Sequence, residues 1–175
     1  MFLSKVLFRS TRHVALLLIL IGLQACAGDK KVVVCPRAGL LTDAQKITHF
    51  RPGAGQDLTD IEYEAAIKSV TLSCDVNEKN IDVELNVTMS AYLGAGATAS
   101  NIRPQYFVTV MTGETIVSKR TNTFNIPFTT AARSVTFSQA SEFKIPLSGK
   151  SSGNFDVMVG FQLSSEELAY NRNRR

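Results

Sequence analysis

Four acidic residues in one short stretch are the best candidates in this sequence for cation binding or acid–base chemistry: Asp57, Asp60, Glu62 and Glu64. From Asp60 onward they occupy alternate positions, so on an extended strand they would share one face, about 7 Å apart. Paired carboxylates can hydrolyse glycosidic bonds, and converging carboxylates can bind Ca²⁺. The same alternation is also typical of a solvent-facing row of charges, and we favour this interpretation over a cation site.

Histidine chemistry lacks the companion residues that it needs. His13 lies in the basic and apolar N-terminal segment, and His49 is the only other histidine in the sequence. Zinc sites require three or four ligands. The one Gly-x-Ser-x-Gly spacing in the sequence, at 149–153, lies in a predicted turn between strands and lacks the strand-to-helix context of a nucleophile motif. We therefore expect His49 to be a surface or loop residue, and we predict no catalytic residue, no metal and no cofactor.

The N-terminal segment has the composition of an export signal. Three basic residues, Lys5, Arg9 and Arg12, precede an apolar run from Val14 to Leu23. Crossing a bilayer takes about 20 apolar residues, so this run is too short for a transmembrane helix. A basic head, a short apolar run and small residues at its end indicate a secretory signal that is removed.

The tetrapeptide Leu23-Gln24-Ala25-Cys26 that ends this segment resembles the lipobox of bacterial lipoproteins. The resemblance implies removal of residues 1–25, a diacylglycerol on the Cys26 thiol and an acyl chain on its new amino group. Two acyl chains already anchor a protein stably, so three would attach it to the membrane permanently. In this class an aspartate after the cysteine retains the protein in the inner membrane. Ala27 stands there instead, which favours the outer membrane, facing the periplasm.

With Cys26 acylated, Cys35 and Cys74 remain as a pair. An oxidising periplasm would allow them to form a disulfide, and two buried free thiols are the alternative. In the chain-entropy model, closing a loop of about 40 residues stabilises the fold by roughly 4 kcal/mol.

Charge does not indicate a nucleic-acid partner. Three of the 19 lysines and arginines lie in the predicted signal, which leaves 16 basic residues against 15 acidic ones. No basic stripe with interleaved aromatic residues occurs. Arg172, Arg174 and Arg175 form a basic tail that either contacts anionic lipid or a partner, or is a frayed end. Tyr92 and Leu93, beside a Gly/Ala-rich stretch that we expect to be a mobile loop, are further candidates for partner contacts.

Most of the chain alternates apolar and polar residues with the period of a half-buried strand. The apolar side falls on odd positions in 61–67 and on even positions in 70–76, which requires a bulge near Lys68-Ser69 and turns Cys74 inward. A polar turn at 77–80 should join this strand to 81–91 in a hairpin. Further predicted strands are 32–35, stopped by Pro36, a central strand at 105–111, then 115–120, 124–128, 135–137 with 143–147 as one strand or two, and 155–163.

Two segments depart from this pattern. Residues 41–50 fit either a helical turn or a strand. Ser164 stands three residues before Glu167, the spacing of a capping box, and predicts a short C-terminal helix that Leu168 and Tyr170 could pack onto the strands.

The sequence thus predicts an all-β protein, an antiparallel two-sheet β-sandwich of immunoglobulin-like type with a short C-terminal helix. A small β-barrel is the alternative. We expect a lipidated N-terminus and spacer at 26–31, one domain at 32–171 and a basic tail at 172–175.

For function, we expect a non-enzymatic, lipid-anchored module of the cell envelope that binds another envelope protein through strand edges and loops. The alternatives are a carbohydrate-active or other hydrolase that uses residues 57–64, and a carrier of an apolar ligand.

Overall fold

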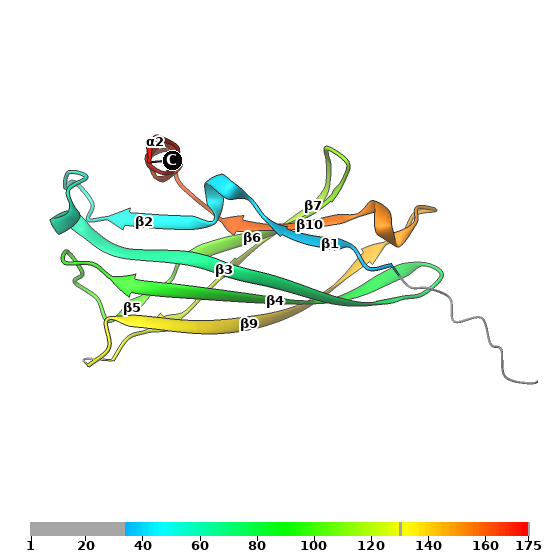
Figure 1. The fold of residues 1–175 in the computed structure, drawn as a ribbon, viewed down its shortest axis with the longest axis horizontal. Helices are drawn as coiled ribbons and strands as arrows, with labels where there is room; N and C mark the ends of the chain where they lie inside the picture. Colours follow the sequence, from blue (N-terminus) through cyan, green and yellow to red (C-terminus); the bar gives the residue numbers. More distant parts are fainter. Residues whose placement is uncertain (1–33, 130, 175) are drawn as a thin grey trace, which may run out of the picture. The chain divides into compact units, whose positions relative to one another are not determined.

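Two four-stranded sheets pack face to face in the computed structural model, which describes residues 34–129 and 131–174 (Figure 1). The first sheet has the order β1 (Arg37–Leu40), β10 (Asp156–Phe161), β6 (Gln105–Thr112) and β7 (Thr115–Thr123). Within it β1 runs parallel to β10, and the other neighbours are antiparallel. The predicted signal, Cys26 and the spacer at 26–31 lie outside the described residues.

The second sheet is antiparallel throughout, with the order β2 (Lys46–Phe50), β3 (Ile61–Val76), β4 (Asn80–Leu93) and β9 (Ser134–Pro146). Two short strands, β5 (Asn101–Ile102) and β8 (Ile126–Pro127), pair with each other. Three 3-10 turns, η2 (Thr42–Ala44), η3 (Leu58–Asp60) and η4 (Ser152–Asn154), and one helix, α2 (Ser165–Asn173), complete the described part. The predicted two-sheet sandwich with a short C-terminal helix is confirmed, and the described strands close no barrel.

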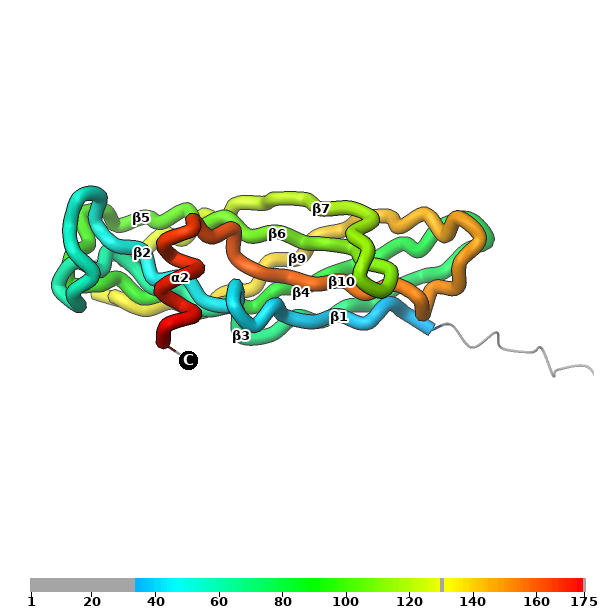
Figure 2. Tube along the Cα trace, turned by 90° about the horizontal axis from the view of Figure 1, so that it is seen from above, coloured from blue at the N-terminus to red at the C-terminus, as the bar shows by residue number. Residues whose placement is uncertain are grey.

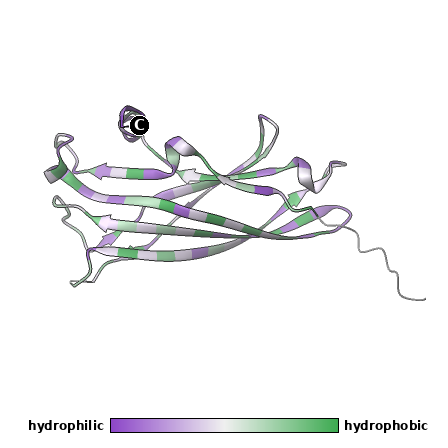
Figure 3. Ribbon diagram, in the orientation of Figure 1, coloured by the Kyte–Doolittle hydropathy of each residue, from purple (hydrophilic) through white to green (hydrophobic). Residues whose placement is uncertain are grey.

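The core lies between the two sheets and follows from the alternation in the sequence. Figure 3 shows apolar and polar residues alternating along the long strands. From 81 to 91 on β4, every second side chain is at most 3% exposed, namely Ile81, Val83, Leu85, Val87, Met89 and Ala91. Opposite them the first sheet buries large side chains, among them Tyr106 on β6 and Phe161 on β10. Burying each such side chain contributes about 1.5 to 3 kcal/mol, so these facing rows stabilise the sandwich.

A β-bulge at Lys68 keeps both halves of β3 facing this core. Ile67 pairs with Met89 and Ser69 with Thr88, so Lys68 has no residue opposite it on β4. Because side chains alternate strictly along a strand, one extra residue moves the inward positions from odd to even numbers. The predicted change of parity is confirmed, and it aims Cys74 toward the core, where it is half-buried.

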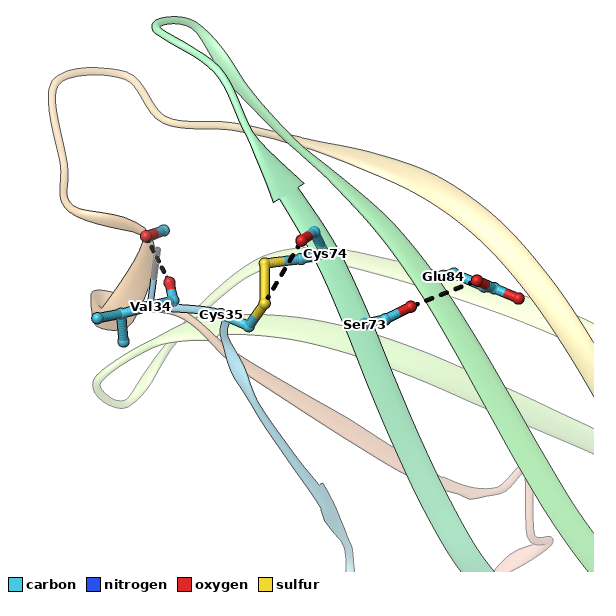
Figure 4. The surroundings of a disulfide bond; sticks show 6 residues. Val34, Cys35, Ser73, Cys74 and Glu84 are labelled. Carbon is cyan, nitrogen blue, oxygen red and sulfur yellow. Dashed lines mark hydrogen bonds between the residues drawn. A yellow bond between two sulfur atoms is a disulfide. The ribbon is translucent and has the colours of Figure 1, made fainter. Parts of the chain in front are cut away.

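A disulfide between Cys35 and Cys74 joins the segment before β1 to β3, and thereby links the two sheets (Figure 4). The two Cα atoms are 5.7 Å apart. Next to it, the Ser152 hydroxyl donates a hydrogen bond of 2.6 Å to the Val34 carbonyl. The predicted pairing is confirmed. The disulfide and the hydrogen bond together hold Val34 and Cys35 in place ahead of β1.

Some elements differ from the sequence prediction. The first described strand begins at Arg37, after Pro36 and not before it, and Arg37 donates its N–H to the Phe155 carbonyl over 3.3 Å. Proline has no N–H to give to a ladder, so strand pairing starts behind it. Residues 41–50 contain both predicted alternatives, η2 and then β2, and 134–146 is a single strand.

Removing the disulfide should destabilise the domain strongly. We expect the double variant Cys35→Ala/Cys74→Ala to lose about 4 kcal/mol of unfolding free energy in chemical denaturation, because the unfolded chain regains the entropy of the open loop. Reduction of the disulfide in the unmodified protein should lower the unfolding free energy by a similar amount. A double variant as stable as the oxidised protein would contradict this.

Candidate functional site

His49, expected to be a surface or loop residue, is a half-exposed residue of strand β2 with defined partners. It lies on β2, and its side chain is 40% exposed. The Nδ1 atom is 2.9 Å from Oε1 of Glu167 on α2, and Nε2 is 3.8 Å from Oε2 of Glu62 on β3. Its ring also stacks on Tyr63, with centroids 4.9 Å apart. The imidazole therefore joins β2, β3 and α2.

Two hydrogen bonds at the N-terminus of α2 hold Glu167 in place. The Ser164 hydroxyl accepts the Glu167 N–H at 3.2 Å, and Glu167 Oε2 accepts the Ser164 N–H at 2.8 Å. This is the capping box that the sequence predicts. One carboxylate thus caps the helix with one oxygen and holds His49 with the other.

Further contacts lay α2 across β2, as seen in Figure 2. The Asn171 side-chain amide donates to the carbonyls of Asp43 and Lys46 at 2.9 and 2.8 Å. Tyr170 meets Phe50 edge to face, with ring centroids 5.1 Å apart. The expected packing of Tyr170 is confirmed, and the helix covers the β2 edge of the second sheet.

The electrostatics of this cluster favour a charged histidine. The hydrogen bond to Glu167 raises the pKa of His49 against the effect of burial, and the charges of Glu167 and Glu62 raise it further. Burial alone would raise the pKa of Glu167, but hydrogen bonds from His49 and Ser164 outweigh it and lower that pKa. Burial and the two carboxylates raise the pKa of Tyr63. Because both imidazole nitrogens face carboxylates, the geometry suits a structural ion pair better than a general base.

The four acidic residues of the candidate cation site do not converge. Asp57 is exposed before η3, whereas Asp60 pairs with Arg51 at 2.6 Å. Glu62 and Glu64 accept hydrogen bonds from Thr98 and Thr48, each at 3.3 Å. Among residues 34–129 and 131–174, no three His, Cys, Asp or Glu side chains gather as a metal site would require. The geometry therefore gives the cation site no support.

The start of the glycine-rich segment after β4, which we expected to be a mobile loop, is hydrogen-bonded to the strand beside it. Gly94 and Gly96 donate their N–H groups to the carbonyls of Glu62 and Ile61 at 2.9 and 2.8 Å. A Cβ on Gly94 would lie 2.1 Å from the Ile61 carbonyl oxygen, so only glycine fits there. Leu93 is 8% exposed and therefore not available for partner contacts. Tyr92 is 48% exposed and remains available for them.

The expected basic tail is largely helix. Helix α2 runs through Arg172 to Asn173, so the predicted boundary at 172 is wrong. Arg172 pairs with Asp43 at 3.1 Å. Arg174 lies over the ring of Tyr170 and donates to its hydroxyl. The helix that packs on β2 therefore continues to Asn173, and Arg175 lies outside the described residues.

A different surface stands out once the sheet order is known, because the four outermost strands are not alike. In the first sheet β1 has four residues, and β7 has a bulge near Ile116 and carries Lys119 and Arg120. In the second sheet β2 is covered by α2, while β9 has 13 residues and pairs on one side alone within the described part of the chain. Short, charged, bulged or covered edges resist further pairing. On β9 the charged residues and the proline are confined to 142–146, so its first eight residues, 134–141, are the edge left open.

The hydrogen-bond register shows which β9 groups face outward. Residues on either side of β9 bond to β4: Leu147 donates to the Lys79 carbonyl and Leu93 donates to the Arg133 carbonyl, both at 2.8 Å. Antiparallel pairs alternate between bonded and non-bonded, so the odd-numbered residues of β9 bond to β4. The even-numbered ones therefore present their N–H and C=O groups to the free side. Pro146, which has no N–H, stands at the end of this series.

Side chains leave this β9 edge accessible. The residues with outward backbone groups are exposed and mostly small: Ser134, Thr136, Ser138, Ala140, Glu142 and Lys144. The inward side chains from Val135 to Phe143 are only half-buried, because β7 on the facing sheet is itself almost fully exposed. We call residues 134–144 with these outward groups the β9 edge. The sequence signal for it was the absence of glycine and proline between 134 and 145.

No family model, no curated protein and no solved structure matches this chain. A search of the described residues for a helix long and apolar enough to cross a membrane found none.

The ion pair between His49 and Glu167 should make stability depend on pH. A histidine whose folded pKa lies above its ordinary 6.5 stabilises the fold fully below that value, and the contribution is lost as pH rises through the raised pKa. The lowered pKa of Glu167 gives stability that is lost below its ordinary 4.5. We expect the unfolding free energy to fall as pH rises above 6.5, measured by denaturant titration.

The control is His49→Gln, which keeps a polar side chain but cannot titrate. Its unfolding free energy should be lower near pH 6 and nearly flat above pH 6.5. An unchanged alkaline decline in this variant would show that His49 is not the group responsible.

Proposed function

We propose that this chain is a lipid-anchored, non-enzymatic protein of the cell envelope that binds another envelope protein through the β9 edge. The observation that carries the proposal is the 13-residue outer strand β9 in a sandwich whose other outer strands are short, bulged or covered within the described residues. The lipobox-like Leu23-Gln24-Ala25-Cys26 supports the membrane anchor at Cys26, and Ala27 supports outer-membrane delivery facing the periplasm.

An open strand edge can bind an extended segment of another chain through backbone hydrogen bonds. Each outward N–H and C=O group on β9 is solvated in the free protein and can pair with an added strand. Main-chain hydrogen bonds then give affinity, and the alternating side chains give specificity. A soluble protein with such an edge risks unspecific pairing, so an edge of this length is retained at a cost.

The competing functions receive less support. A hydrolase based on residues 57–64 would need two carboxylates directed at one substrate, whereas Asp60 and Glu62 face different partners. A carrier would need a hollow interior, whereas the space between the sheets is filled by buried aromatic side chains such as Tyr106, Phe124 and Phe161.

The anchor is tested with Cys26→Ser. A serine cannot form the thioether, so we expect an uncleaved precursor without lipid mass in intact-mass spectrometry. The variant Cys35→Ser/Cys74→Ser removes the other two thiols and should keep the lipid mass. Normal processing of Cys26→Ser would refute the anchor.

The binding edge is tested by placing a photo-crosslinking amino acid at Ala140 in the membrane-bound protein. As a matched control we choose Thr121, which lies on the other exposed outer strand, β7. We expect a specific crosslinked product, identified by mass spectrometry, from position 140 and not from 121. Equal crosslinking at both positions would argue against the β9 edge.

A further inference from the structure

We propose that the β9 edge takes an extended segment of another protein that carries basic side chains outward and apolar side chains inward. This inference rests on the proposed function and specifies the chemistry of the partner. Three features of the surface carry it: the unpaired backbone groups of the edge, an acidic depression beside it, and half-buried aromatic side chains beneath it.

The acidic depression lies on the outer face of β3, β4 and β9, near the Pro146 end of the edge. It encloses about 660 Å³. Its polar lining consists of Ser73, Asp75, Asp82, Glu84, Glu142 and Lys144. The ammonium group of Lys144 pairs with Asp82, and the Ser73 hydroxyl donates to Glu84 at 3.3 Å. Four carboxylates against one ammonium leave the depression negative.

Glu142 connects the depression to the edge. It belongs to the outermost strand, its side chain is exposed, and its backbone groups are among those that face outward. A residue opposite it on an added strand would have its Cβ about 5 Å away. A lysine or arginine at that position would lie beside Glu142, and its long side chain would extend toward Glu84, which pairs with Glu142 one strand further in.

The inward row selects the other side chains of the partner. Phe137 and Phe143 pack against the core but are only partly buried. Phe137 is held edge to face by Phe124, and the Arg120 guanidinium lies 5.7 Å from the Phe143 ring centre. Apolar side chains on an added strand would remove the remaining aromatic surface from water, which favours binding.

A second copy of this chain fits the edge less well. Placing Lys144 of the copy opposite Glu142 also brings the copy's Pro146 opposite Ala140, where it has no N–H to donate, and shortens the overlap. Longer antiparallel overlaps place Glu142 opposite the copy's Glu142, Ala140, Ser138, Thr136 or Ser134, and leave both acidic depressions uncompensated. The charge pattern therefore favours a different, basic partner.

The test uses the full-length protein in detergent micelles and two synthetic peptides, KVTVKVTVK and EVTVEVTVE, each with a fluorescent label. Fluorescence anisotropy should show at least tenfold tighter binding of the lysine peptide at low salt. Amide hydrogen exchange should slow at even-numbered residues of 134–144 when this peptide is bound, while the odd-numbered amides are protected in both states.

Variants locate the contact. Ala140→Pro removes an outward N–H without taking a bond from β4, and should weaken binding at least tenfold. Thr121→Pro makes the same change at an outward position of β7, and should leave binding within twofold. Glu142→Lys, a surface substitution with little risk to folding, should abolish the preference for the lysine peptide.

The inference is overturned if neither peptide binds, if both bind equally well, or if the protection maps to β7. It is also overturned if the even-numbered amides of β9 become protected at high protein concentration without peptide, because a second copy would then be the occupant. A partner crosslinked at position 140 without any preference for basic peptides would leave the proposed function standing and remove this inference alone.

Discussion

The extra residue at Lys68 is the constraint on which the rest of the sandwich depends. With 16 residues, β3 is the longest strand, and it pairs with both β2 and β4. Without the bulge, one half of its apolar side chains would face water, since a strand exposes every second residue on each face. The bulge directs Ala65 and Ile67, and then Leu72 and Cys74, into one core. Both the facing rows and the inter-sheet disulfide depend on that register.

The two outer strands of the second sheet, β2 and β9, differ in how their free edges are covered. At β2 the chain uses a capped helix, an ion pair at His49 and two amide hydrogen bonds from Asn171 to cover the edge. At β9 the described residues, 34–129 and 131–174, provide nothing comparable, and Glu142, Lys144 and Pro146 protect one end. Since a covered edge on one side shows that this fold can close its edges, the open one is better understood as functional than as incidental.

Local features were predictable from the sequence, because they depend on neighbours along the chain. The alternation of β4, the parity change at Lys68 and the capping box at Ser164 are of this kind. The partners of His49 were not predictable, because Glu167 lies 118 residues away. The burial of Leu93 and the exposure of β9 were equally inaccessible, since each depends on which strands become neighbours. The lipid anchor at Cys26 and the binding function remain predictions.

The position of the disulfide has a mechanical consequence. Tension applied to the chain ahead of Cys35 passes through a covalent bond into β3, which is hydrogen-bonded along its length to β4. The four-residue β1 lies behind that bond and is spared from being peeled off β10. For a domain tethered by its N-terminus, the long β3–β4 hairpin would take the tension, and the four-residue pairing of β1 with β10 would be shielded from it.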